Sequence, residues 1–338
     1  MKKVGIIGTG LQFKRRAPVI AQSKDSELAA VASLHLEHAE EAARPYGCRA
    51  CATWQEVVGL DDVDVIVVCT PPHLHAEISI AAMESGKDVL CEKPLTRTLQ
   101  ESEQLVQAVK QTGRIFKCGF NHRHHPAIWD AYKLVERGEI GRPTFGRCRY
   151  GICGRPGYEQ EWRADPNQAA GGQFIEQGSH AIDLFRWFLG EIVEVSCMSG
   201  IQFFREQPLD DNGMAIFRTE RRAMASLHAS LTQWKNQFSF EVFGEDGYIM
   251  VEGLGASYGT EKLVFGKRDF NLPFNDHVTE YRGGDRSWSA EWQEFMSAIR
   301  EGRPPIGNEH DGFAAMRVAL GAYEAEKQKR VLPINTGA

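Results

Sequence analysis

The stretch KVGIIGTGLQF (residues 3–13) decides the fold of this chain. Residues 3–8 form an apolar run ending in glycine, as in a buried β-strand, and a helical pattern follows over residues 15–22. Between them, Gly8 permits a tight turn, and Gly10 lets backbone N–H groups approach a pyrophosphate at the helix start. This context predicts a dinucleotide-binding turn, although Phe13 stands where a third glycine is usual. The residues expected to contact the cofactor in this turn are Gly8, Gly10, Leu11, Gln12 and Phe13.

Strand and helix patterns alternate up to residue 120, and strand patterns dominate afterwards. Repeated β–α units give a parallel sheet with helices on both faces, whereas consecutive strands with short turns favour an antiparallel sheet. We therefore expect an α/β fold, with an N-terminal Rossmann domain at residues 1–120 and a C-terminal α+β domain at residues 121–338. The C-terminal helix is allowed to pack back on the first domain. Expected strands are 3–8, 27–33, 63–70, 88–94 and 114–120; expected helices are 15–22, 38–47, 54–59, 75–86, 98–113, 128–137, 171–190, 287–301 and 309–327.

The composition narrows the classes of function. The 338 residues carry a formal net charge of −6 with no long basic run, which argues against nucleic acid as a partner. The apolar run at the N-terminus is too short for a signal peptide, and no window is apolar enough to cross a membrane. We expect a soluble, cytoplasmic protein.

Two patterns suggest metal or redox chemistry but are weak. Cys48 and Cys51 form a CxxC pair without a second pair, so the eight cysteines are interpreted as ordinary reduced thiols. The run HRHHP (residues 122–126) is rich in histidine, but adjacent histidines do not easily share one ion. No metal is predicted.

The end of the second strand bears on the choice of cofactor. A carboxylate there pairs with the ribose hydroxyl of NAD, but this strand ends at Ser33. The missing carboxylate permits the 2′-phosphate of NADP, with Arg15, Arg16 or His38 as candidate partners. NAD(P) is expected, and NADP is slightly preferred over NAD.

Two further motifs follow strands at the edge where ligands bind in open α/β sheets. CTPPHLHAE (residues 69–77) places Thr70, Pro71 and His75 near the expected cofactor. The motif CEKPL (residues 91–95) brings Glu92 and Lys93 to the same edge, where a lysine can donate a hydrogen bond to a substrate oxygen.

The segment GGQFIEQGSHAIDLFRWFLG (residues 171–190) has helical periodicity. At about 100° per residue, its apolar side chains fall on one side of the helix. Glu176, His180, Asp183 and Trp187 fall on the other side, within a wedge of about 60°. An imidazole between two carboxylates suits acid–base chemistry on a hydroxyl group.

These motifs together resemble the glucose–fructose oxidoreductase / inositol dehydrogenase (Gfo/Idh/MocA) family of NAD(P)-dependent sugar and cyclitol oxidoreductases. The resemblance rests on the glycine turn, TPPHLH, EKP and GGxxxExxxH, where the family carries GGGxxxDxxxH. It implies a C-terminal domain with an open antiparallel sheet and a homodimer or homotetramer formed through that sheet. The family's catalytic lysine falls on Lys93, its acid/base histidine on His180, and its aspartate on Glu176. Asn121 and Arg123, in GFNHRHHP, are implied to lie near the nicotinamide and the substrate.

The expected activity is hydride transfer between a nicotinamide cofactor and a hydroxyl or keto carbon of a sugar, sugar derivative or cyclitol. His180 would accept the proton, Lys93 would stabilise the developing alkoxide, and Glu176 would orient His180 or bind a neighbouring hydroxyl. The expected substrate contacts are Arg123, Tyr158, Trp162, Arg163 and Asp183. Two alternatives remain open: a glycosidase-type enzyme that recycles a tightly bound NAD, and a non-catalytic dinucleotide-sensing regulator of the same fold.

Overall fold

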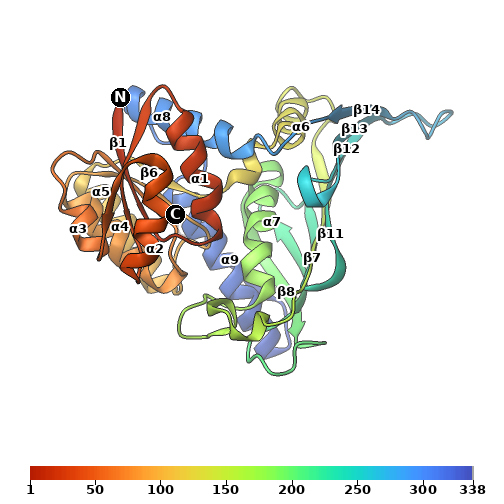
Figure 1. Ribbon diagram of the computed structural model, residues 1–338. Helices are drawn as coiled ribbons and strands as arrows, with labels where there is room; N and C mark the ends of the chain where they lie inside the picture. Colours follow the sequence, from red (N-terminus) through yellow and green to blue (C-terminus); the bar gives the residue numbers. More distant parts are fainter. Residues whose placement is uncertain (337–338) are drawn as a thin grey trace. The chain divides into compact units, whose positions relative to one another are not determined.

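The computed structural model describes residues 1–336, and the chain divides into two compact units (Figure 1). Unit 1 comprises Met1–Asn121 and Trp288–Phe313. Unit 2 comprises His122–Ser287 and the residues from Ala314 onward. The division expected from the sequence gives each domain one continuous range, whereas in the structure residues 288–313 cluster with the first unit.

Unit 1 is built on a six-stranded sheet with the order β3-β2-β1-β4-β5-β6. Every neighbouring pair is parallel, which confirms the predicted Rossmann domain. The central strand β4 has the sequence VIVV and is buried throughout, as expected for a strand covered on both faces. The strands are β1 (Lys2–Ile7), β2 (Ser26–Ala32), β3 (Arg49–Cys51), β4 (Val65–Val68), β5 (Asp88–Cys91) and β6 (Phe116–Cys118).

The predicted helices of unit 1 are present, but α1 begins at Leu11 rather than at residue 15, and α2 ends at Ala43 rather than at residue 47. In α5, Thr98 and Glu101 form a capping box, and Gly113 ends the helix with a φ of 63°. The late helix α8 adds Trp292 and Phe295 to the core that contains Val4 and Ile6. The helices are α1 (Leu11–Gln22), α2 (Leu36–Ala43), α3 (Trp54–Val58), α4 (His75–Glu84), α5 (Leu99–Thr112) and α8 (Ser287–Glu301), with short 3₁₀ turns η1 (Arg44–Tyr46) and η2 (Pro72–Leu74).

Unit 2 is built on a nine-stranded sheet with the order β14-β13-β12-β11-β7-β10-β9-β8-β15. Only the central β7–β10 pair is parallel, so the prediction of a mostly antiparallel sheet is confirmed. The strands are β7 (Pro143–Cys153), β8 (Ile192–Gly200), β9 (Asn212–Thr219), β10 (Met224–Ser230), β11 (Thr232–Gly244), β12 (Gly247–Glu252), β13 (Glu261–Lys267), β14 (His277–Tyr281) and β15 (Leu332–Pro333). The helical segments outside unit 1's core are η3 (Asn121–His124), α6 (Pro126–Glu136), η4 (Tyr158–Gln160), η5 (Trp162–Ala164), α7 (Gln173–Leu189), η6 (Ala256–Tyr258) and α9 (Glu309–Gln328), whose first residues belong to unit 1.

The two faces of the unit 2 sheet differ. Helix α7 packs on one face against β7, β9 and β10 (Figure 1). Its Phe185 ring meets Phe217 and Phe240. Strand β9 alternates buried and exposed residues, and its exposed side chains include Met214 and Ile216. On the second face, β9 therefore exposes apolar side chains.

Neither a membrane span nor a metal cluster is present in the part of the chain that the structure describes. No helix within residues 1–336 is long and apolar enough to cross a bilayer. The same residues contain no group of three or more histidine, cysteine or acidic side chains arranged to hold an ion. All eight cysteines are free thiols. The cytoplasmic location expected from the sequence stays a prediction.

Candidate active site

The glycine turn of unit 1 leaves open space at the start of α1. Gly8 has a φ of +101°, and a Cβ there would lie 2.7 Å from the carbonyl oxygen of Cys69, so the turn packs tightly on the end of β4. Gly10 is the N-cap of α1, and a Cβ built on it meets no atom within 4 Å. The first turn of α1 has no side-chain cap and no acidic residue. An anion can therefore reach the N–H groups of this helix.

Three side chains, one in α1 and two after β4, bury polar atoms that lack a hydrogen-bond partner within residues 1–336. They belong to Gln12, Thr70 and His73, and each is a side-chain oxygen or nitrogen. Buried polar atoms in native proteins are almost always satisfied, so unpaired ones indicate a place for a ligand or water. Ser33, at the end of β2, shares a hydrogen bond of 3.0 Å with Thr9 in the glycine turn. This set of donors and acceptors fits a dinucleotide.

Other predicted cofactor contacts differ in their exposure and surroundings. They are Leu11, Phe13, Pro71 and Asn121. Leu11 is exposed, and Pro71 is the N-cap of η2. The Phe13 ring is buried in the core of unit 1 beside Tyr46, so a ligand at the turn would meet its backbone. Asn121 is buried at the end of unit 1.

His75 connects two loops at the carboxyl edge of the sheet. Its Nδ1 lies 2.9 Å from the carbonyl oxygen of Pro94, and its Nε2 lies 2.8 Å from that of Thr70. Burial lowers the pKa of His75, so the imidazole is neutral near neutral pH and donates to one of the two oxygens at a time. Both ring nitrogens therefore face the protein backbone.

Glu92 and Lys93 follow β5 at the same edge, and both are buried. Arg16 donates to Glu92 over 2.5 Å and to Glu291 of α8 over 2.9 Å. Burial alone lowers the pKa of Arg16, but the two carboxylates outweigh it and hold the pKa above its ordinary value. Arg16 is therefore buried and paired with two carboxylates inside unit 1. This arrangement does not support the prediction that Arg16 reaches a 2′-phosphate.

In unit 2, the start of α7 is fixed by side chains distant in the sequence. The Asp210 carboxylate accepts a hydrogen bond from the backbone N–H of Phe174 at 2.8 Å and another from the Tyr323 hydroxyl at 2.7 Å. The Tyr323 oxygen accepts from the N–H of Gly172 at 3.1 Å. A Cβ on Gly172 would overlap the backbone of Asp210, which explains the glycine at this position.

Glu176, His180 and Asp183 of α7 each contact a different residue. Arg163 lies 3.4 Å from Glu176 and 4.3 Å from the centre of the Trp162 ring. Tyr158 is also buried. Its burial, and to a smaller extent the negative charge of Glu176, raises the pKa of its phenol. The segment that the sequence predicted to bind substrate therefore lies beside Glu176.

His180 stacks on a histidine that the sequence interpretation considered only as a metal candidate. The rings of His180 and His122 are 3.8 Å apart at their centres and 22° from parallel. His122 also lies 3.0 Å from the hydroxyl of Tyr150, a buried residue of β7. The histidine run after β6 was the available signal for this contact. Its His125 instead meets Glu261 at 3.1 Å, so the run is dispersed among different partners.

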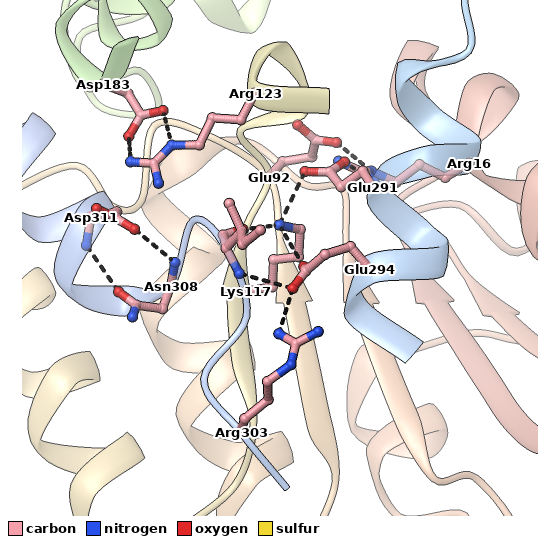
Figure 2. Close-up of polar contacts among 11 residues, drawn as sticks. Arg16, Glu92, Lys117, Arg123, Asp183, Glu291, Glu294, Arg303, Asn308 and Asp311 are labelled. Carbon is pink, nitrogen blue, oxygen red and sulfur yellow. Dashed lines mark hydrogen bonds and ion pairs between the residues drawn. The ribbon is translucent and has the colours of Figure 1, made fainter. Parts of the chain in front are cut away.

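Asp183 and Arg123, both predicted to contact substrate, form a buried ion pair with each other (Figure 2). Two parallel hydrogen bonds of 2.7 and 2.6 Å join the guanidinium to both carboxylate oxygens. The Arg123 guanidinium also lies 5.1 Å from the centre of the Trp187 ring. This pair holds η3 and α7 together within unit 2.

Comparisons with known proteins match both parts of the chain. Residues 2–120 match the oxidoreductase family with an NAD-binding Rossmann fold, and residues 128–250 match the GFO/IDH/MocA C-terminal domain. Levoglucosan dehydrogenase of Pseudarthrobacter phenanthrenivorans is 31% identical over 93% of this chain and 88% of its own. The scyllo-inositol 2-dehydrogenase (NAD(+)) of Bacillus subtilis is 28% identical over 95% of this chain and 92% of its own. A solved levoglucosan dehydrogenase, in complex with NADH and levoglucosan, has a TM-score of 0.89 at 25% identity, covering 99% of this chain and 100% of that one.

Proposed function

Since this chain belongs to the GFO/IDH/MocA family of oxidoreductases, we propose that it transfers a hydride between a nicotinamide dinucleotide and a hydroxyl or keto carbon of a sugar, sugar derivative or cyclitol. The relatives are named as dehydrogenases and reductases of such compounds. The main observation in support is the open N-terminus of α1 at Gly10, because it provides an anion site for the pyrophosphate of a dinucleotide.

We propose that NAD(P) binds along the glycine turn. Gly10 would bring the α1 N–H groups to the pyrophosphate, while Gln12 and Thr70 would satisfy their buried oxygens on the ligand. When bound, the nicotinamide supplies the hydride chemistry. Side chains of this chain must then manage the proton of the reacting hydroxyl.

The choice between NAD and NADP follows from the end of β2. No carboxylate occupies residues 33–36, directly after β2, and Arg15, His35 and His38 are exposed. A carboxylate would repel a 2′-phosphate, so we propose a small preference for NADP. Relatives are named with NAD or were solved with NADH. Separate titrations with NADH and NADPH test the preference.

We propose that Lys93 donates a hydrogen bond to the reacting oxygen and that His180 accepts its proton. A buried ammonium stabilises a developing alkoxide, and an imidazole exchanges protons near neutral pH. Glu176 would bind a neighbouring hydroxyl or orient His180.

Tyr158, Trp162 and Arg163 would bind the sugar beside Glu176. Aromatic rings and a guanidinium suit stacking on, and hydrogen bonding to, a polyol. Asp183 and Arg123 already saturate much of each other's hydrogen-bonding capacity, so we propose that they support the substrate site as a pair.

The exposed sheet face supports a homodimer or homotetramer. Met198, Met214, Ile216 and Met224 are each more than half exposed, and a groove of about 640 Å³ runs over this face. An apolar face of this kind is typical of an interface between subunits. Light scattering coupled to gel filtration measures the assembly directly.

The deciding experiment combines binding, turnover and a matched pair of variants. NADH and NADPH are titrated by fluorescence, and polyols and sugars are then screened for a change in nicotinamide absorbance. Lys93→Met should lower kcat/KM by about 10²- to 10⁴-fold with dinucleotide binding retained. Lys87→Met is the control, because Lys87 is as buried as Lys93 but precedes β5 and donates to the Leu60 carbonyl.

Three results would contradict the proposal. Normal turnover by Lys93→Met would remove the proposed role of this lysine. Release of free sugar without net nicotinamide reduction would indicate the glycosidase alternative. Dinucleotide binding without turnover across the whole panel would indicate the regulator.

A further inference from the structure

A network of mostly buried charged side chains in unit 1 includes Glu92, the residue before Lys93 (Figure 2). It joins α1, the end of β5, β6 and α8, which are far apart in the sequence. Positive and negative charges are equal in number. The members are Arg16, Glu92, Lys117, Glu291, Glu294 and Arg303.

Arg16 links Glu92 to the rest of this network. Its side chain is 3% exposed, its Nε donates to Glu92 over 2.5 Å, and its Nη1 donates to Glu291 over 2.9 Å. Glu291 is fully buried in α8. The planar guanidinium therefore fixes the orientation of the Glu92 carboxylate relative to Glu291 of α8, which a single point charge could not do.

The network continues away from Glu92 toward the surface. The Lys117 amino group lies 3.9 Å from Glu291 and 3.5 Å from Glu294, and it donates to the Ile306 carbonyl. Arg303, which is half-exposed, donates to Glu294 over 2.7 Å. Helix α8 is thus tied to the ends of both β5 and β6 by charge.

Lys93 is held on both sides. Glu92 precedes it and is paired with Arg16. Pro94 follows it, and the Pro94 carbonyl faces the buried His75 ring at 2.9 Å. Two buried side chains therefore restrain the backbone immediately before and after the proposed catalytic lysine.

Stability alone does not explain such a network. Buried ion pairs are often no more stable than apolar residues of the same volume, because removing charges from water is costly. The network is also incompletely satisfied, since Arg16 Nη2 and Glu291 Oε1 have no hydrogen-bond partner among residues 1–336. A charge network that lowers stability is better explained by a role in positioning nearby residues.

We propose that Arg16 is a positioning residue for Lys93. Pairing with both Glu92 and Glu291, Arg16 fixes the Glu92 side chain and hence the backbone of the next residue. Without it, the buried Glu92 carboxylate would lose this partner and draw the neighbouring ammonium away from the substrate oxygen. The inference rests on the proposed function, since it requires Lys93 to act on substrate.

The test compares kcat with dinucleotide binding in Arg16→Gln, Arg16→Lys and Arg303→Gln. Arg16→Gln should lower kcat about tenfold or more while the dinucleotide Kd changes less than about threefold. Arg16→Lys keeps one charge but not the planar fork, so it should recover part of kcat. Arg303→Gln removes an arginine from the same network at its distant end and should keep the kcat of the parent enzyme.

Each outcome decides the inference. A normal kcat for Arg16→Gln, with a loss of melting temperature like that of Arg303→Gln, would show a structural role only and overturn it. Should Arg16→Gln fail to fold, Glu291→Gln serves instead; a fall in kcat of about threefold is expected, and no fall would overturn the inference. Lys93→Met is measured alongside. If it is active, the proposed function fails; if it is inactive and Arg16→Gln is normal, only this inference fails.

Discussion

Helices α1 and α7 both have a glycine as the N-cap residue, and the two glycines have nearly the same backbone dihedral angles. Gly10 has φ and ψ of −73° and −156°, and Gly172 has −84° and −151°. Neither provides a side-chain cap. Their surroundings are opposite: no atom lies within 4 Å of a Cβ at Gly10, whereas a Cβ at Gly172 would strike the backbone and the carboxylate of Asp210.

The comparison separates two uses of glycine at a helix start. At α1 the missing side chain leaves the N–H groups open, as an anion site requires. At α7 the space is taken by Asp210, which caps the helix from another part of unit 2. A glycine before a helix is therefore not by itself a sign of ligand binding, and substitutions can tell the two uses apart.

The largest expected effect is that of Gly172→Ala. Its methyl group would have to displace Asp210, so we expect a loss of about 3 kcal/mol in the free energy of unfolding. Urea denaturation measures this. Gly284→Ala in the same unit is the control, because a Cβ there meets nothing within 4 Å. Equal stability of the two variants would contradict the tight packing at α7.

The next effect is that of Tyr323→Phe. The variant keeps the ring that packs on Phe174 but loses the hydroxyl shared by Asp210 and Gly172. Because both polar groups are left buried, we expect a loss of about 2 kcal/mol in unfolding free energy. Combined with Gly172→Ala in a double-mutant cycle, the losses should be less than additive. Full additivity would mean that the two residues do not act on one structure.

Gly10→Ala should affect binding more than folding. Alanine is a poorer N-cap than glycine, so a loss of up to about 1 kcal/mol in unfolding free energy is expected. The methyl group would project into the proposed pyrophosphate site, and we expect dinucleotide affinity to fall about tenfold. Fluorescence titration measures the affinity. Unchanged affinity would argue that the opening at α1 is not the site.

The smallest effect concerns pH. Burial raises the pKa of Asp210 in spite of its hydrogen bonds, so the folded state holds this proton more tightly than the unfolded state. The contribution of Asp210 to stability therefore falls as pH rises from about 3.9 through the raised value. The stability of the parent protein relative to Asp210→Asn should decline by about 1 kcal/mol or less over this window. Denaturation midpoints at several pH values measure it, and a rise would contradict the assigned direction.

The fold prediction depended on patterns within short stretches of the sequence. The apolar run before Gly8, the helix pattern after Gly10 and the regular strand–helix alternation are all read within short windows, and the parallel sheet was confirmed. The helical period also located α7 within one or two residues of its bounds. Each of these features depends on neighbours in the sequence, which is why one chain suffices to predict them.

The environment of the candidate site depended on distant residues. Arg16 was expected near the cofactor phosphate, but its partner Glu291 lies 275 positions away. Asp210 and Tyr323 left no sign in the sequence that they fix the start of α7. The roles assigned to Lys93, His180 and Glu176 stay predictions, since residue type and motif spacing do not define the geometry of a bound substrate.

The divided course of unit 1 has a consequence for folding. Its core receives Trp292, Phe295 and Met296 from α8, so a nascent chain that has left the ribosome only as far as β6 lacks those side chains. Excising residues 1–120 as an independent fragment would expose the apolar surface that α8 covers, a situation that favours aggregation. Unit 2 likewise takes in residues after Phe313, so unit 1 is complete only once residue 313 has been translated, and unit 2 is complete later still.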